Sequence, residues 1–540
     1  MKHIIYKNTF KLIIVLAILV NSCKKADEWL DKPKPDGQVS YDALFNSVIE
    51  IDQLINGSYA SALGFAGNGL AFAANYVATL SGDFIAPYPG NYSQIDGIFL
   101  SMYQRKNSIL YWSDHARVLQ YCSKPENICN RVIEEVESGR YNEDPDYNVL
   151  GPQLLGEAYL FRAMINFEYT RYFGAQYHSS TINDKAWLYR KNYISSIESA
   201  RKSRETVGNS YRFLIEDCKK AIENLPLEYD PAKHIATYNA NRFTKDAAIA
   251  LLAQVYFQQN DFVNARDQVN LLLGTSPGTP SQYPLEQVGS GFPEDIYYRT
   301  QIETYGRSKN QEVIFAFHGK CGTTPMSSNN PRLKEFVPKP EDINIGASRS
   351  EITGTGKWTM SDYFINYVNF DTLNDQRYLK LLDKIVMKDG KSYWWPLKYS
   401  KSYDINVLWF RSAEFLLMRA ECNARLGNST DAIADLNAIR TRAGLSSYTG
   451  SSDDSGNLIQ DIIKERAREL FLEKYRIWEL LRLGSIDGTK ISQGDRLLKP
   501  SGLDGIDAIF TGPGLLDWNS SVWRFPIPDS EFLYNPDALN

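Results

Sequence analysis

The sequence predicts a mainly α-helical protein: a tetratricopeptide-like helical-repeat scaffold with long irregular loops and few short strands. Three observations carry this prediction. Several long stretches place apolar residues at helical spacing. Two of them, residues 244–273 and 413–440, repeat the same pattern of helix, tight turn and helix. Residues 274–410 are instead rich in Gly, Pro, Ser, Asn and Tyr, with only short strand-like runs such as residues 312–317.

The N-terminus has the pattern of a bacterial lipoprotein signal peptide. Nine consecutive apolar residues, 12–20, follow three lysines and lead to Cys23. A membrane-spanning helix needs about 20 apolar residues, so this run suits a cleaved signal. We expect residues 1–22 to be removed, Cys23 to be lipidated, and residues 23–40 to form a polar leash. The alternative is an ordinary secretory signal with an incidental cysteine.

The charge and hydropathy of the chain argue against some classes of binding partner. Loss of the three signal-peptide lysines moves the formal net charge from −5 to −8. The sequence has no basic stripe or arginine-rich run, which argues against nucleic acid as a partner. No later apolar run is long enough to cross a bilayer, so we expect the lipid to be the sole membrane contact.

The cysteines and histidines show no metal-binding spacing. We interpret the cysteines that remain after cleavage as buried apolar residues and the histidines as structural. We therefore predict no cofactor besides the N-terminal lipid, and leave calcium open. The residues concerned are Cys122, Cys129, Cys218, Cys321, Cys422, His115, His178, His234 and His318.

The helical segments are predicted to pack as pairs within one body, residues 41–540. Small residues such as Ala250 and Ala420 lie where paired helices would cross, which lets the backbones approach. The predicted segments are residues 153–173, 206–225 (stopped by Pro226), 244–273, 413–440 and 458–483, the last closing the array. We assign the scaffold mainly to residues 41–80, 100–273 and 411–484, and the ligand face mainly to residues 84–98 and 274–410.

Motifs that would indicate an enzyme are weak. Residues 274–278 fit a nucleophile-elbow string but follow a helix rather than a strand. Residues 354–357 lack the upstream glycine of a phosphate loop. The charged residues Glu465, Arg466, Arg468 and Glu469 are read, with Arg476, as an ion-pair network on an amphipathic helix. A pair of glycosidase carboxylates stays open, because their separation is visible only in three dimensions.

Several segments, spread over nearly the whole chain, resemble the SusD/RagB family of outer-membrane lipoproteins. Each motif alone is weak, but their number, their order and the lipoprotein signal agree. The matching segments are residues 156–163 (GEAYLFRA), 172–174 (YFG), 203–207 (SRETV) with 215–217 (IED), 375–378 (DQRY), 398–399 (KY), 411–414 (RSAE), 436–444 (LNAIRTRAG), 465–470 (ERAREL) with Arg476, 525–528 (FPIP) and 535–536 (NP).

The resemblance implies a non-catalytic, cell-surface protein that binds glycan and delivers it to a SusC-like, TonB-dependent outer-membrane transporter. It also implies a tetratricopeptide-like scaffold whose loops form the ligand face. Asp27 and Glu28 resemble the short signal that exports such lipoproteins to the cell exterior, although Ala26 interrupts it. RagB-type members imply an alternative, the capture of peptides or protein fragments. A scaffold that binds only protein, and an enzyme, are further hypotheses.

A glycan site needs exposed aromatic rings for the flat C–H faces of sugars and polar side chains for their hydroxyls. The loop-rich segments contain both. Each loop tyrosine has the alternative of packing on the scaffold, and we expect residues 394–395, a Trp-Trp pair, to lie in the core. The binding candidates are Tyr88, Asn91 and Tyr92 in the first loop, Tyr298 and Arg307 in the following insertion, and Trp358.

Overall fold

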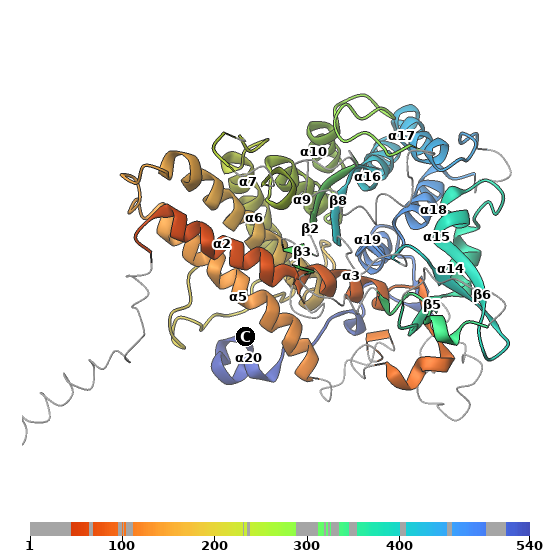
Figure 1. Cartoon of the computed structure of the whole chain (residues 1–540), viewed down its shortest axis with the longest axis horizontal. Coiled ribbons are helices and arrows are strands. Elements are labelled where there is room, and N and C mark those ends of the chain that lie inside the picture. Colours follow the sequence, from red (N-terminus) through yellow and green to blue (C-terminus); the bar gives the residue numbers. More distant parts are fainter. Residues whose placement is uncertain are drawn as a thin grey trace, which may run out of the picture.

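The computed structural model is mainly helical with few short strands, as predicted (Figure 1). The structure describes residues 45–63, 69–95, 100, 102–103, 112–230, 232–234, 238–287, 312–317, 320–321, 324–325, 334–344, 354–399, 407–450, 456–492 and 515–539. Cys23, Tyr298 and Arg307 lie outside these residues. The division into signal peptide, leash and single body therefore stays a prediction.

The elements follow the predicted alternation of helices with a region of short strands. The α-helices are α2 (Val48–Leu63), α3 (Leu70–Ser81), α5 (Trp112–Glu137), α6 (Tyr147–Phe173), α7 (Val207–Asn224), α8 (Tyr238–Asn241), α9 (Lys245–Gln258), α10 (Phe262–Leu273), α14 (Asp362–Val368), α15 (Gln376–Leu381), α16 (Ser412–Arg425), α17 (Ser429–Arg442), α18 (Leu458–Leu470), α19 (Arg476–Asp487) and α20 (Asp529–Tyr534). The 3₁₀ helices are η3 (Pro89–Gln94), η5 (Pro340–Asp342), η8 (Ser521–Trp523) and η9 (Pro536–Leu539).

The strands form five two-stranded antiparallel ribbons rather than one sheet among the described residues. They are β1 (Ile85–Pro87) with β5 (Trp358–Met360), β2 (Val313–Phe317) with β8 (Val407–Arg411), β3 (Lys320–Cys321) with β4 (Thr324–Pro325), β6 (Leu382–Val386) with β7 (Ser392–Pro396), and β9 (Ile491–Ser492) with β10 (Leu515–Leu516).

The helices form a continuous array in which each packs on its sequence neighbours. Helix α6 packs against α5 and α7, α7 against α9, α10 against α9 and α16, and α16 against α17 and α18. The expected pairing of residues 153–173 with 206–225 is confirmed by α6 and α7, although α6 begins at Tyr147. Helix α2 lies along α5 and α6 (Figure 1).

The two predicted helical hairpins are α9–α10 and α16–α17. Ala250, Ala265 and Ala420 are fully buried where the paired helices meet, as the small-residue pattern predicted. Each hairpin turns through a residue in the left-handed region: Asn260 (φ 63°) in the first and Gly427 (φ 84°) in the second. A side chain is strained in that region, so glycine and asparagine suit these positions.

The predicted helix over residues 458–483 is wrong as a single element. It is divided into α18 and α19, and Leu472 (φ 62°) and Lys474 (φ 49°) between them are left-handed. No glycine or proline marks the break. Tertiary hydrogen bonds replace the lost helical ones: Lys398 Nζ donates to the carbonyl of Phe471 (2.8 Å), and Asn75 Nδ2 to that of Leu472 (2.7 Å).

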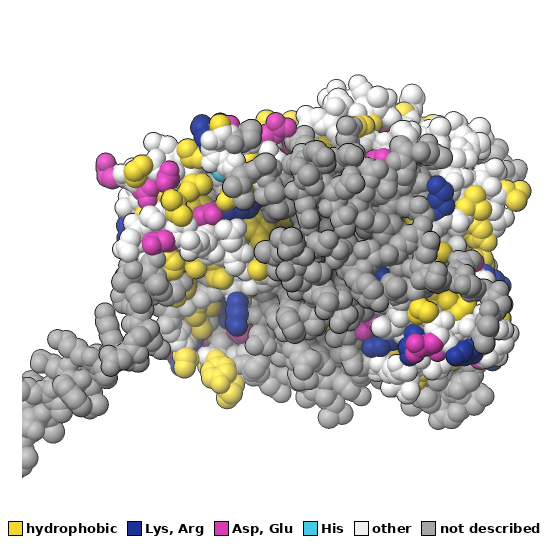
Figure 2. Space-filling model, in the orientation of Figure 1, with side chains coloured by type: hydrophobic (Ala, Val, Ile, Leu, Met, Phe, Trp, Pro, Cys, Tyr) yellow, Lys and Arg dark blue, Asp and Glu magenta, His cyan; other side chains and the backbone are white. Residues whose placement is uncertain are grey.

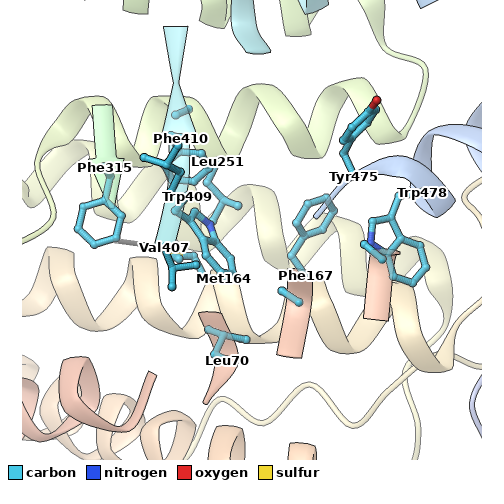
Figure 3. Packing of buried hydrophobic residues seen from close by; sticks show 14 of the residues in the cluster. Leu70, Met164, Phe167, Leu251, Phe315, Val407, Trp409, Phe410, Tyr475 and Trp478 are labelled. Carbon is cyan, nitrogen blue, oxygen red and sulfur yellow. The ribbon is translucent and has the colours of Figure 1, made fainter. Parts of the chain in front are cut away.

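The hydrophobic core lies where the helical array meets the β2–β8 ribbon. Figure 3 shows Val407, Trp409 and Phe410 of β8 together with Leu251 of α9 and Met164 of α6. All five side chains are buried. Every residue of β8 is buried, so this strand is a central element of the core rather than a surface ribbon.

A cluster of buried charges, here called the ionic cluster, joins this core to the region of short strands. The carboxylate of Glu469 lies at its centre. It accepts hydrogen bonds of 2.6–3.0 Å from Arg377, Arg411 and Arg442, and these four side chains are at most 2% exposed. The other members are Glu312, Asp375, Lys398, Glu465, Arg468 and Glu473, so five acidic and five basic side chains are combined.

The ionic cluster contains equal numbers of positive and negative side chains. This balance permits its burial, because an unpaired ion inside a protein costs several kcal/mol. Burial alone raises the pKa of Glu469, but Arg442, Arg411 and Arg377 outweigh it and hold that pKa well below its ordinary value. The stability that Glu469 contributes is therefore present above the ordinary carboxyl pKa and is lost as the pH falls below it. The ion-pair interpretation of the charges around residues 465–469 is confirmed.

We predict that Glu469→Gln lowers the free energy of unfolding by about 3–5 kcal/mol, because three buried arginines lose a shared counter-charge. Urea unfolding followed by circular dichroism measures the change. Glu216→Gln is the matched control: Glu216 also contacts two cations, but its side chain is 45% exposed, and the expected loss is at most about 1 kcal/mol. Equal losses for the two variants would contradict a structural role for the ionic cluster.

Candidate ligand-binding site

The structure brings two of the predicted ligand-face segments together as one unit. Strand β1 pairs with β5, so that Ile85 lies opposite Met360 and Pro87 opposite Trp358. The pairing continues beyond the strand, since the amide of Tyr88 donates to the carbonyl of Lys357 (2.9 Å). Strand β5 in turn packs against β7. We call the unit made of β1, η3, β5, β6 and β7 the loop platform, and it occupies one end of the molecule with α14 and α15 (Figure 1).

The buried side chain of Asn91 holds segments of the loop platform together. This side chain is 4% exposed, and Nδ2 donates to Asp342 Oδ2 (2.9 Å) and to the carbonyl of Gly356 (3.0 Å). Gly356 is left-handed (φ 59°), and a Cβ there would lie 2.9 Å from the amide nitrogen of Lys339. The amide of Asn91, predicted to contact ligand, is thus engaged in holding η3 against β5 and η5.

Tyr88 and Trp358 were predicted as exposed aromatic planes, and the structure corrects this. Trp358 is fully buried, and its Nε1 donates to the hydroxyl of Tyr76 (2.8 Å). Tyr88 is 3% exposed, with its ring 5.1 Å from that of Tyr393 and 5.3 Å from that of Trp395. Trp358 thus packs against α3 and Tyr88 against β7, so that both rings brace the loop platform from within.

Burial also shifts the pKa of Tyr88. Desolvation, with smaller contributions from Asp389 and Asp342, raises the pKa of its hydroxyl to about 12. The shift is further away from physiological pH, at which a tyrosine hydroxyl is protonated in any case. The raised pKa agrees with a ring that packs in the interior of the loop platform.

Tyr92 is the described candidate that keeps part of its ring at the surface, since it is half-buried. The sequence reasoning missed Tyr393, which is also half-buried and donates to Asp389 Oδ2 (2.7 Å). The sequence feature that could have identified Tyr393 is the two-residue periodicity of the strand over residues 392–396. This periodicity places the side chain of Tyr393 on the same face of the strand as that of Trp395. The expected core position is confirmed for Trp395, which is fully buried, whereas Trp394 is half-buried.

The described residues carry no group of three His, Cys, Asp or Glu side chains arranged to hold a metal ion. Cys129, Cys218 and Cys422 are buried free thiols, as predicted for the cysteines. His178 contacts Ser180 Oγ, and His234 contacts Gln153 Oε1, so both have structural partners. On the face shown in Figure 2, acidic, basic and hydrophobic side chains are interspersed among the described atoms.

The motifs that carried the family resemblance lie in the scaffold. Arg162 of the GEAYLFRA segment forms two 2.7 Å hydrogen bonds with Asp217 of α7. The DQRY, KY, RSAE, LNAIRTRAG and ERAREL segments all contribute to the ionic cluster. These residues therefore belong to a framework that positions the loop platform.

Residues 360–538 match the model of the "SusD family", and residues 28–257 match a model described as "Starch-binding associating with outer membrane". The chain belongs to the SusD family, whose members are binding proteins and not enzymes.

Individual relatives agree with this assignment. Two SusD-like proteins of Formosa agariphila are 24% and 23% identical to the chain, over 69% and 92% of it and 73% and 93% of their own lengths. The fold is similar to that of a SusD-like carbohydrate binding protein from Bacteroides vulgatus (TM-score 0.68, 15% identity, covering 92% of this chain and 98% of that one). It is also similar to surface glycan-binding protein A from Bacteroides uniformis (TM-score 0.62, 19% identity, 91% and 98%).

We predict that Asn91→Ala loosens the loop platform, because Asp342 and the carbonyl of Gly356 lose a buried donor, at a cost of about 1–3 kcal/mol. Hydrogen–deuterium exchange should become faster over residues 354–360, with smaller changes in the helical array. Ser93→Ala, an exposed change in the same 3₁₀ helix, should leave the exchange unaltered. Unchanged exchange in Asn91→Ala would contradict the role assigned to this amide.

Proposed function

We propose that the protein is a lipid-anchored, cell-surface glycan-binding protein that delivers oligosaccharides to a SusC-like, TonB-dependent transporter. The observation that carries this proposal is the pair of family matches over residues 28–257 and 360–538, one of which is described by starch binding and outer-membrane association. Similar folds in proteins titled as carbohydrate- or glycan-binding support it.

The loop platform has the chemistry that a sugar requires. Tyr92 and Tyr393 are half-buried, so each has a braced ring with part of its area at the surface. Asp389 is exposed and Asp342 is half-buried, and their carboxylates are acceptors for sugar hydroxyl groups. Aromatic rings combined with a few polar groups are the usual composition of a small-ligand site. Tyr298 and Arg307 remain candidates from the sequence.

The proposed attachment to the membrane is inferred from the N-terminal sequence. No helix in the described part of the chain is long and apolar enough to cross a membrane. A diacyl or triacyl group on Cys23 would supply a stable anchor, because two or more acyl chains bind a bilayer far more tightly than one. An anchor of this kind would keep the loop platform free to meet both a glycan and a transporter on the cell exterior.

We predict that Cys23→Ser releases the full-length protein from the outer membrane, because the serine cannot carry the thioether-linked lipid. Membrane fractionation and protease accessibility of intact cells measure this. Lys24→Gln, which changes the neighbouring charge and keeps the cysteine, should remain membrane-bound and accessible. Retention of Cys23→Ser in the membrane fraction would contradict lipid anchoring.

We predict that the soluble chain, residues 24–540, is retarded in native gels containing one class of polysaccharide among starch, xylan, pectin, mannan and host glycans. Tyr92→Ala should weaken that retardation severalfold, since a stacking ring is lost. Tyr534→Ala, an exposed change on α20, is the control and should migrate as the unaltered protein. Binding to a peptide digest with no retardation by any glycan would instead favour peptide capture.

A further inference from the structure

A ligand-sized pocket lies outside the loop platform, between α14, α18, α19 and β9. Its volume is about 480 Å³, which falls within the range of 300–1,000 Å³ found for small-molecule sites. None of the residues predicted from the sequence to bind ligand lines it. We call it the C-terminal pocket, because three of its four walls come from residues beyond 450.

The wall formed by α14 is held in place by its neighbours. Ser361 caps the helix, with its Oγ accepting from the amide of Phe364 (3.0 Å), and Arg468 Nε of α18 donates to the carbonyl of Val368 (2.7 Å). Both ends of this short helix are therefore fixed. The C-terminal pocket is preformed, so that a ligand would bind without the cost of ordering its walls.

Two tyrosines of α14 form an aromatic wall. Tyr363 and Tyr367 lie four residues apart, their ring planes differ by 5° and their centroids are 6.3 Å apart. Both are half-buried. The guanidinium of Arg476, paired with Asp83 at 2.7 and 2.9 Å, lies 5.1 Å from the ring of Tyr367 and supports it from inside. Parallel phenol rings of this kind offer a flat surface for the C–H face of a sugar.

The rest of the lining combines an aliphatic floor with polar side chains at the rim. Ile459, Ile463 and Leu483 contribute the floor. Gln460 and Thr489 are exposed at the rim, and within the described residues their side chains form no hydrogen bond. Such groups are free to donate to and accept from hydroxyl groups of a ligand.

The charges of the lining indicate the sign of the ligand. The lining carries four cationic side chains, those of Arg425, Lys464, Arg476 and Lys490, and two carboxylates, those of Asp83 and Asp487. Arg476 is neutralised by Asp83, and Arg425 by Glu421. The carboxylate of Asp487 accepts from the amide of Thr489 (2.8 Å). Lys490 reaches Asp517 only at 3.6 Å, with both side chains more than half exposed. Lys464 is half-buried and has no ion pair or hydrogen bond of its side chain in the part of the chain that the structure describes. An unpaired ammonium group beside an aromatic wall favours an anionic group on the ligand.

We propose that the C-terminal pocket is a second carbohydrate site that binds an acidic sugar unit, with its ring on Tyr363 and its carboxylate or sulfate group on Lys464. The ligand class rests on the proposed glycan-binding function, whereas the site is separate from the loop platform. A peptide fits less well, because the main walls are helices whose backbone groups are already hydrogen-bonded and offer no strand edge.

The test is isothermal titration calorimetry on residues 24–540 with three oligosaccharides of equal length: one with uronate groups, one sulfated and one neutral. We expect an anionic oligosaccharide to bind, and Lys464→Gln to weaken it roughly tenfold, as the loss of one charge-assisted hydrogen bond would. The uronate and sulfate arms identify the anionic group. Tyr363→Ala should remove the binding that depends on Lys464, and Tyr363→Phe, which keeps the ring, should retain it.

Lys219→Gln, an exposed change on α7, is the matched charge control and should bind as the unaltered protein. Thermal unfolding of each variant establishes that it is folded. Equal affinities of Lys464→Gln and Lys219→Gln, tightest binding of the neutral oligosaccharide, or binding of acidic peptides alone would overturn the proposal. Retardation by an anionic polysaccharide that is lost in Tyr92→Ala but unchanged in Tyr363→Ala would overturn the second site and leave the proposed function standing.

Discussion

The structure depends on the burial of the ionic cluster around Glu469. Its members come from α15, β8, α17 and α18, and from the segments that precede β2 and α15, follow β7 and join α18 to α19. They meet in an interior where an unpaired ion would cost several kcal/mol. Each element is therefore confined to the position at which its charge is matched. Hydrophobic contact alone would tolerate small sliding movements of packed helices, but paired hydrogen-bonded ions do not.

The ionic cluster also determines where the loop platform lies. Lys398 follows β7, and its ammonium group reaches the carbonyl of Phe471 at the break between α18 and α19. Strand β7 then supplies Tyr393 and Trp395, whose rings enclose Tyr88 at the start of η3. From the other side, Arg476 of α19 binds Asp83, two residues before the start of β1. The position of Tyr92 thus follows, through a few contacts, from charges buried in the scaffold.

The residues that identify the family are largely different from the residues proposed to determine which ligand binds. The resembling motifs supply the arginines, lysine and carboxylates of the framework, so they indicate the class of protein. The side chains proposed to contact ligand, such as Tyr92, Tyr363 and Lys464, lie outside those motifs, whereas Arg476 belongs to them and supports the wall of the C-terminal pocket.

The sequence alone determined the helical hairpins, the small residues at their crossings and the local pair of Glu465 with Arg468, because helical periodicity relates residues only three or four positions apart. It also predicted the family. The partners of Glu469 on α15, β8 and α17 were decided by the tertiary structure. Tertiary structure alone decided that Trp358 faces inward, that the chain breaks near Leu472, and that Tyr363 and Lys464 line one pocket. Those outcomes depend on partners distant in sequence, such as Tyr76 for Trp358 and Asn75 for Leu472, and local patterns do not encode such contacts.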